Sequence, residues 1–176
     1  MKRAVWIWQF FGFAVTALGG TLLHFLYGWL GEAAWIAPFS GVNESTWEHM
    51  KLLFWPAFIF AVIESVFFKA YGSFWCVKLR GTAIGLSFIP ILFYSYNGII
   101  GKSPDFVNIS IFFISAAIAF LYEACALKNK KIVCTSPRRA FFLLCIIAIC
   151  FALFTFRTPE INIFKDPITG FYGIQA

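Results

Sequence analysis

The chain has 176 residues, of which 61% are hydrophobic and 12% are charged. Soluble domains average about 45–50% apolar and about 25% charged residues, so the composition argues against a soluble fold and favours an integral membrane protein. The formal net charge is +6, but the basic residues are scattered between apolar segments. They are read as topology signals, and no nucleic-acid partner is expected.

The apolar segments predict an all-α, polytopic membrane bundle of five transmembrane helices in a single domain, 1–176. The first is long enough to cross a hydrocarbon core about 30 Å thick with some tilt, and the fifth is short but almost wholly apolar. The first continues to Leu30, which is longer than the apolar core of a signal peptide, so we expect it to be retained. The predicted spans are residues 4–30, 46–71, 81–100, 104–127 and 140–156, followed by a polar tail over 157–176.

Small residues recur at every fourth position of the first span, at Gly12, Thr16, Gly20 and Gly28, and His24 lies in the same stripe. Such a stripe allows a neighbouring helix to approach closely. We therefore expect a packing seam that leads to His24.

The second span begins with Ser45-Thr46-Trp47-Glu48, which matches a capping box. In that motif the side chains of Ser45 and Glu48 each accept a hydrogen bond from a backbone N–H of the first turn. Pro56 and Pro90 interrupt the second and third spans near their middles. Broken helices of this kind line binding sites in some transporters.

The distribution of basic residues predicts the orientation. Five spans place the termini on opposite sides, and ten of the 14 Lys and Arg fall on the side of the N-terminus. Because cytoplasmic loops carry the excess of basic residues, the N-terminus is predicted inside and the C-terminus outside. No cysteine then lies in an outward loop, so all five are expected to be free thiols. The basic residues predicted inside are Lys2, Arg3, Lys69, Lys78, Arg80, Lys128, Lys130, Lys131, Arg138 and Arg139.

Four predicted helix ends bring polar side chains to the outer membrane interface. His24 lies roughly 30 Å along the first helix, at the depth where the second helix starts. The chain contains one other histidine, His49, and it falls in the same layer. The members of this layer are His24, Glu44, Glu48, His49, Tyr94, Tyr96, Asn97 and Asp105, with Asn43 as a neighbouring candidate.

Imidazole and carboxylate together are the usual ligands of zinc or another borderline divalent metal. We expect His24, His49 and either Glu44 or Glu48 to hold such an ion. The alternative is structural: Glu48 completes the helix cap, and His24 bonds a neighbouring helix.

The first functional hypothesis is a membrane-embedded, metal-dependent hydrolase that acts on a lipid or another interfacial substrate. The carboxylate not bound to metal, Glu48 or Glu44, or else Asp105, would be the general base. Tyr94 or Tyr96 would stabilise developing negative charge.

Two acidic residues lie deeper. Glu64 is roughly 24 Å below the start of the second helix and belongs to the inner half. Its expected partners are Arg80 or Lys69, and Glu123 is expected to pair with Lys128. The second hypothesis is a non-enzymatic binder or transporter of a small solute or lipid, with Glu64 as the coupling group. The third is an accessory subunit of a larger membrane complex.

Three stretches carry a family resemblance. They are Thr21-Leu22-Leu23-His24-Phe25-Leu26-Tyr27, Val42-Asn43-Glu44-Ser45-Thr46-Trp47-Glu48-His49, and Asp166-Pro167-Ile168-Thr169-Gly170-Phe171-Tyr172-Gly173-Ile174. The chain resembles an uncharacterised family of small bacterial multi-pass membrane proteins with a V-N-E-S-T-W-E-H signature and a D-P-x-T-G-x-Y-G-I tail. The resemblance implies a location in the bacterial inner membrane and implies no activity or cofactor.

Overall fold

The computed structural model describes residues 2–68, 71–129 and 134–174. Within these residues the chain forms five α-helices that are long and apolar enough to cross a membrane, and it forms no β-strand. The fold class predicted from the sequence is confirmed. The helices are α1 (Lys2–Trp29), α2 (Thr46–Phe67), α3 (Phe74–Ile99), α4 (Asp105–Asn129) and α5 (Pro137–Phe156), and a short 3-10 helix, η1 (Asn162–Phe164), follows in the tail.

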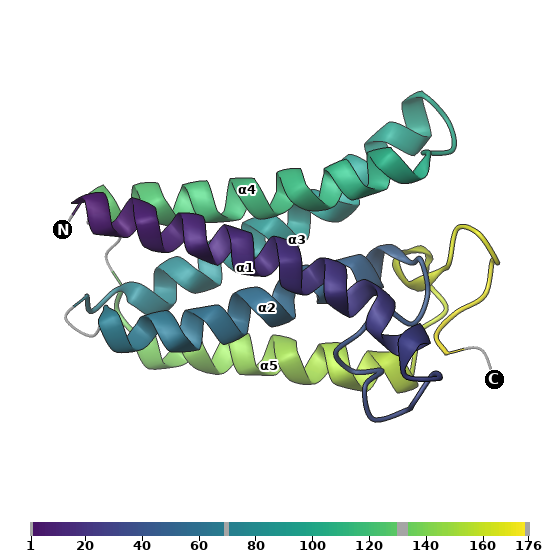
Figure 1. Ribbon diagram of the computed structural model, residues 1–176, viewed down its shortest axis with the longest axis horizontal. Coiled ribbons are helices and arrows are strands. Elements are labelled where there is room, and N and C mark those ends of the chain that lie inside the picture. Colours follow the sequence, from purple (N-terminus) through teal and green to yellow (C-terminus); the bar gives the residue numbers. More distant parts are fainter. Residues whose placement is uncertain (1, 69–70, 130–133, 175–176) are drawn as a thin grey trace.

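The helices form one elongated bundle in which α1 lies beside α2 and α4 (Figure 1). Helix α3 packs against α4, α2 and α5. The two chain ends lie at opposite ends of the bundle, as an odd number of spans requires (Figure 1). We call the end with the C-terminus the outer end and the other the inner end; which of them faces the cytoplasm stays a prediction from the charges.

Helix α3 begins at Phe74, seven residues before the predicted start at Gly81. The prediction treated Lys78 and Arg80 as loop residues because they are charged. In the structure Lys78 is only 3% exposed, since its ammonium group meets two carboxylates inside the bundle. A charged side chain therefore does not mark a helix end when its partners lie on neighbouring helices.

The small-residue stripe of α1 is a packing seam over only part of its length. A Cβ atom on Gly20 would lie 2.5 Å from Phe112 Cζ and 2.9 Å from the backbone oxygen of Leu52. A Cβ atom on Gly12 would likewise collide with aromatic rings of α2 and α4. Gly28 is different, because nothing lies within 4 Å of the Cβ position. The seam therefore does not extend to Gly28, contrary to the prediction.

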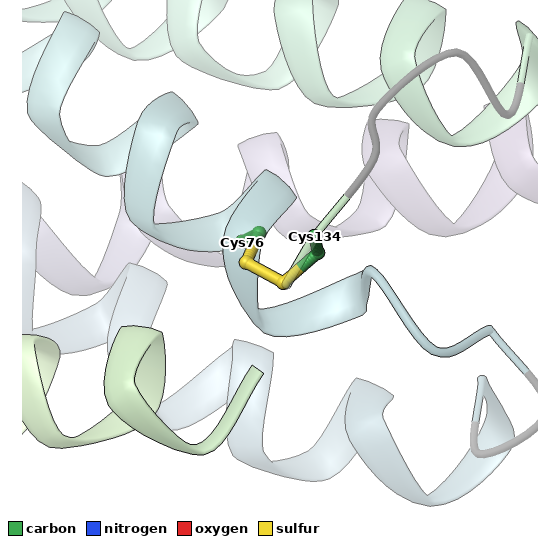
Figure 2. Close-up of a disulfide and its surroundings, with 2 residues drawn as sticks. All are labelled: Cys76 and Cys134. Atoms are coloured by element: carbon green, nitrogen blue, oxygen red, sulfur yellow. A yellow bond between two sulfur atoms is a disulfide. The ribbon is translucent and has the colours of Figure 1, made fainter. Parts of the chain in front are cut away.

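A disulfide joins Cys76, in the first turn of α3, to Cys134, which precedes α5 (Figure 2). The two Cα atoms are 6.0 Å apart, within the normal range for a bridge. The prediction of five free thiols is therefore wrong, and Cys125, Cys145 and Cys150 are the free ones. The bridge lies at the inner end, which the charge census assigns to the reducing cytoplasm. The disulfide therefore favours an oxidising compartment at the inner end, whereas the distribution of basic residues places that end in the cytoplasm.

The disulfide predicts how many cysteines react with a thiol reagent before and after reduction. In denatured protein that has not been reduced, three cysteines should react with an alkylating reagent, and all five should react after reduction. Mass spectrometry of the intact protein measures both numbers. The Cys76→Ser variant is the control, because it releases Cys134 and should give the same count with and without reductant. Five reactive thiols in unreduced parent protein would show that the bridge is absent.

Candidate functional site

The loop after α1 is held against the outer end of that helix. The backbone N–H of Tyr27 donates to Ser40 Oγ over 2.9 Å, and Ser40 Oγ in turn donates to the Leu23 carbonyl. The Gly41 N–H donates to the same carbonyl over 3.2 Å. These contacts use the carbonyl and N–H groups near the helix end, and they place the returning chain next to His24.

Asn43 and Ser45 then start α2. The Ser45 N–H donates to Asn43 Oδ1 over 2.9 Å, and Ser45 Oγ accepts from the Glu48 N–H over 3.4 Å. The predicted N-cap is therefore confirmed, but the second half of the capping box is wrong, because Asn43 takes the place of the Glu48 carboxylate. Asn43 Nδ2 also donates to the Gly173 carbonyl over 2.9 Å, which ties the C-terminal tail to this loop.

This local structure brings His24, Glu44 and His49 together. Glu44 lies between the two rings: its Oε1 is 3.5 Å from His24 Nε2, and its Oε2 is 3.6 Å from His49 Nε2. One donor atom from each residue lies within 4.8 Å of the others. All three side chains are half-buried at the outer end of the bundle. Of the residues expected in the outer layer, these three form one cluster, which we call the His–Glu–His site.

The orientation of His49 is set by the cap. Its Nδ1 lies 3.0 Å from the Ser45 carbonyl oxygen, which can only accept a hydrogen bond. In the neutral imidazole the proton is therefore on Nδ1, and the unprotonated Nε2 lies 3.6 Å from Glu44 Oε2. Bonding of the second ring nitrogen to a carbonyl is the usual way in which a metal-ligating histidine is held.

A cavity of about 210 Å³ opens beside the two histidines, between α1, α2 and α4. Its walls are mostly apolar and include Phe25, Ile109 and Phe113. These three side chains are also exposed on the outside of the bundle, where lipid would surround them. The His–Glu–His site thus borders a space that an apolar group can enter from the bilayer.

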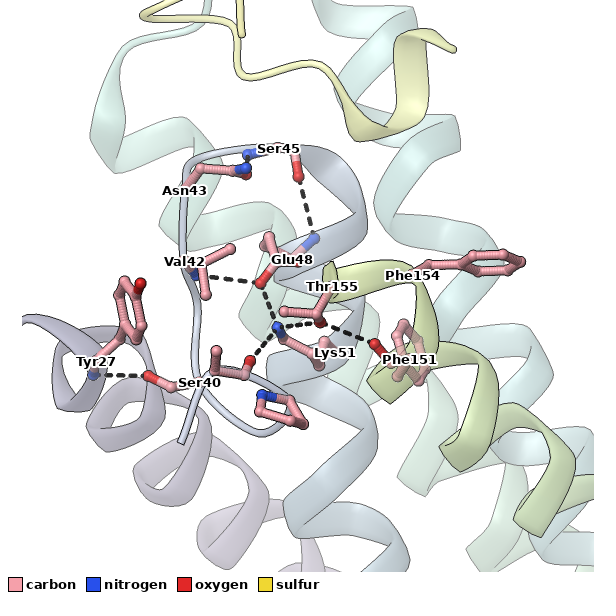
Figure 3. A network of polar contacts seen from close by, with 12 residues as sticks. Tyr27, Ser40, Val42, Asn43, Ser45, Glu48, Lys51, Phe151, Phe154 and Thr155 are labelled. Atoms are coloured by element: carbon pink, nitrogen blue, oxygen red, sulfur yellow. Dashed lines mark hydrogen bonds and ion pairs between the residues drawn. The ribbon is translucent and has the colours of Figure 1, made fainter. Parts of the chain in front are cut away.

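Glu48 is not a member of the His–Glu–His site and belongs instead to a polar network around Lys51 (Figure 3). Its Oε2 is 2.5 Å from Lys51 Nζ and accepts from the Val42 N–H over 3.1 Å. Lys51 Nζ also donates to the Ala37 carbonyl over 2.8 Å and to Thr155 Oγ1 over 3.1 Å. Glu48 and Lys51 form a buried structural pair that joins α2 to α5 and to the preceding loop.

The remaining outer candidates shape the turn between α3 and α4. Tyr94 and Asp105 are exposed, and Tyr96 lines a different groove, between those two helices. Asn97 Nδ2 donates to the Phe93 carbonyl over 2.7 Å, and Asn97 Oδ1 accepts from the Ser103 N–H over 3.0 Å. The turn extends away from the rest of the bundle (Figure 1), which is why a common depth did not bring these residues to the histidines.

Sequence reasoning missed two polar residues beside the site. Thr46 and Asn108 line a small cavity that also borders Glu44 and His49. No sequence pattern marks either residue as functional. Thr46 lies within the capping stretch, and Asn108 is an ordinary polar residue in the first turn of α4. Only the approach of α4 to the start of α2 makes them neighbours.

The deeper acids share one cation. Lys78 Nζ lies 2.5 Å from Glu64 Oε2 and 2.5 Å from Glu123 Oε2. The predicted partners Arg80 and Lys128 are therefore wrong, while Lys69 falls outside the described residues. The error follows from reading Lys78 as a loop residue, although it lies in the second turn of α3.

A comparison with protein families finds one that covers nearly the whole chain. The model of DUF6512, a family of unknown function, matches residues 2–174. The chain belongs to this family. No curated protein and no solved structure matches it. Because the function of DUF6512 is unknown, membership in the family assigns no activity to this chain, and its own side chains are the guide to its function.

Proposed function

We propose that this DUF6512 protein binds a divalent transition-metal ion at the His–Glu–His site. The observation that carries the proposal is the convergence of three donor atoms, from positions 24, 44 and 49, within 4.8 Å. Two imidazoles and one carboxylate form a ligand set typical of catalytic zinc, and such a site keeps a fourth position open.

The three donor atoms lie within 4.8 Å of one another, so they would have to close by up to about 1.5 Å to hold one ion. Ligands of one tetrahedral zinc, each at about 2.0–2.1 Å, lie about 3.3 Å apart. The Glu44 oxygens are already 3.5 and 3.6 Å from the two Nε2 atoms. Glu44 belongs to the loop before α2 rather than to a helix, so the carboxylate can move to complete the geometry.

The function that we infer is metal-dependent hydrolysis of a lipid or another interfacial substrate. An ion with three protein ligands and an open position supplies Lewis-acid chemistry for such a reaction. The apolar cavity beside His24 offers the substrate a route from the bilayer. Glu48 is not available as the base, since Lys51 holds it, and Thr46 and Asn108 are the polar groups beside the site that can orient the substrate.

Metal content is the first test. We expect about one equivalent of zinc to stay with the purified protein after incubation and desalting, and the His24→Ala, His49→Ala variant to retain none. Glu44→Gln should weaken binding by more than about tenfold, the loss that even a change in the outer shell of ligands produces. Asp105→Asn is the matched control, an acid at the same end of the bundle but exposed and outside the site, and it should bind zinc like the parent.

Hydrolysis is tested separately, with a short-chain p-nitrophenyl ester in mixed micelles. We expect the parent protein to cleave it, a chelator to abolish cleavage, and added zinc to restore it. Binding without cleavage of interfacial esters would reject the hydrolase and leave the metal site. Absence of metal from correctly folded parent protein would reject both.

A further inference from the structure

Four buried polar side chains, one from each of α1 to α4, meet near the inner end of the bundle. Gln9 Nε2 donates to Glu64 Oε1 over 2.5 Å, and the ammonium of Lys78 contacts both Glu64 and Glu123. Lys78 Nζ also donates to Gln9 Oε1 over 3.4 Å. None of the four is more than 4% exposed. We call Gln9, Glu64, Lys78 and Glu123 the inner charge cluster.

The inner charge cluster contains two carboxyl groups and one cation. In the part of the chain that the structure describes, both acids form their ion pairs with Lys78. The other near neighbours of the ammonium are uncharged, and include the rings of Phe74 and Phe120, each centred 5.5 Å from Nζ. With both acids ionised, one negative charge would remain uncompensated inside the bundle. An unpaired charge is very costly in such surroundings, so one more positive charge is needed.

The bonding pattern indicates which acid takes that charge. Glu64 Oε1 accepts a hydrogen bond from Gln9, and Glu64 Oε2 lies 2.5 Å from the ammonium of Lys78 in an ion pair without hydrogen-bond geometry. Glu123 contacts Lys78 through Oε2, while its Oε1 lies against Gly81, where a Cβ atom would collide with it. A metal ion would need several oxygen ligands around it, as calcium and magnesium sites have. A proton needs a single oxygen, and Glu123 Oε1 provides one.

We propose that Glu123 carries an exchangeable proton and that the inner charge cluster is a proton-binding site inside the membrane. The site is closed towards the inner end by a layer of buried apolar side chains that includes Val5, Val77 and Leu127. Two buried hydroxyl groups without hydrogen-bond partners, Thr16 Oγ1 and Ser115 Oγ, lie on its outer side. They are two helical turns from Gln9 and Glu123, about 10–12 Å away along α1 and α4.

These hydroxyl groups give the proton a direction of travel. Buried polar groups normally have partners, so two unpaired ones at the same depth call for an explanation. They are polar steps between the inner charge cluster and the outer half of the bundle. Intramembrane acids that take up and release protons are the elements of proton relays and proton-coupled transporters. This proposal does not depend on metal binding at the His–Glu–His site.

The test is infrared spectroscopy of the protein reconstituted in liposomes at neutral pH, where a protonated carboxyl group has its own C=O stretching band. We expect one such band in the parent, shifted after exchange into deuterated water. Glu123→Gln and Glu64→Gln should each abolish it, because the remaining acid and Lys78 balance. Lys78→Gln should about double it, since both acids are then without a cation.

Glu44→Gln is the matched control, a carboxylate that is half-buried at the other end of the bundle, and it should leave the band unchanged. The parent spectrum decides the question even if the cluster variants do not fold. Absence of a carboxylic acid band in the parent, or a band that does not shift in deuterated water, overturns the proposal. So does a band that persists in folded Glu123→Gln, or one that appears only when sodium and potassium are removed, since the balancing charge would then be a metal cation.

Discussion

Replacing Lys51 with methionine is expected to lower the free energy of unfolding by about 3–5 kcal/mol, because Glu48 then becomes a buried carboxylate without its cation. Lys51 is 0% exposed, and all three N–H donors of its ammonium are used, on Glu48, Ala37 and Thr155. Methionine keeps the apolar stem and removes the charge. Denaturant unfolding in mild detergent, followed by tryptophan fluorescence, measures the change.

Two variants identify the cause of the Lys51 effect. Lys102→Met replaces an exposed lysine beside the α3–α4 turn and should change stability by less than about 0.5 kcal/mol. Combining Lys51→Met with Glu48→Gln should recover part of the loss, since neither remaining side chain is charged. A loss from Lys51→Met no larger than that of an exposed ion pair, below about 1 kcal/mol, would contradict the buried pair.

Gly20→Ala is expected to destabilise the protein by about 1–3 kcal/mol, the usual cost of overfilling a packed interior. The added methyl group would meet Phe112 and, at 2.9 Å, the backbone oxygen of Leu52, so α1 would have to move away from α2. Thermal unfolding in detergent measures the effect. The zinc binding that we propose for the His–Glu–His site should also weaken, because the shift separates His24 from His49.

Gly28→Ala is the matched control in the same helix and the same stripe. Nothing lies within 4 Å of the Cβ position of Gly28, so the methyl group meets no atom. Alanine favours a helix over glycine by about 1 kcal/mol, and this variant should be as stable as the parent or more stable. Equal effects of the two substitutions would show that helix propensity, and not close packing at the seam, determines the change in stability.

The helices were predictable because each apolar segment must form its backbone hydrogen bonds within itself in lipid, independently of how the other segments pack. This local requirement explains why four of the five helices begin within three residues of their predicted starts. Helix α3 is the exception, and the reason is not local. Lys78 is buried through carboxylates of α2 and α4, so its charge cannot be interpreted until those helices are placed.

The candidate site was predictable in part for the same reason. The length of α1 predicted the depth of His24, and the start of α2 at the same interface predicted that Glu44 and His49 lie at that depth. Direction is a different matter. Glu48 and His49 are successive residues and therefore lie about 100° apart around the helix axis, so one faces the histidine of α1 and the other cannot. Glu48 turns to Lys51, whose further partner Thr155 is 104 residues away in the chain.

Composition and apolar segment length were sufficient to determine a five-helix membrane bundle, its helix spans to within a few residues for four of the helices, and the cap that starts α2. These properties depend on each segment and on the lipid around it. The tertiary structure alone decided the Cys76–Cys134 bridge, which of Glu48 and His49 faces the histidine of α1, and the sharing of Lys78 by Glu64 and Glu123. Each of these depends on how helices far apart in the chain are rotated towards one another, and that rotation follows from the packing of all the helices together.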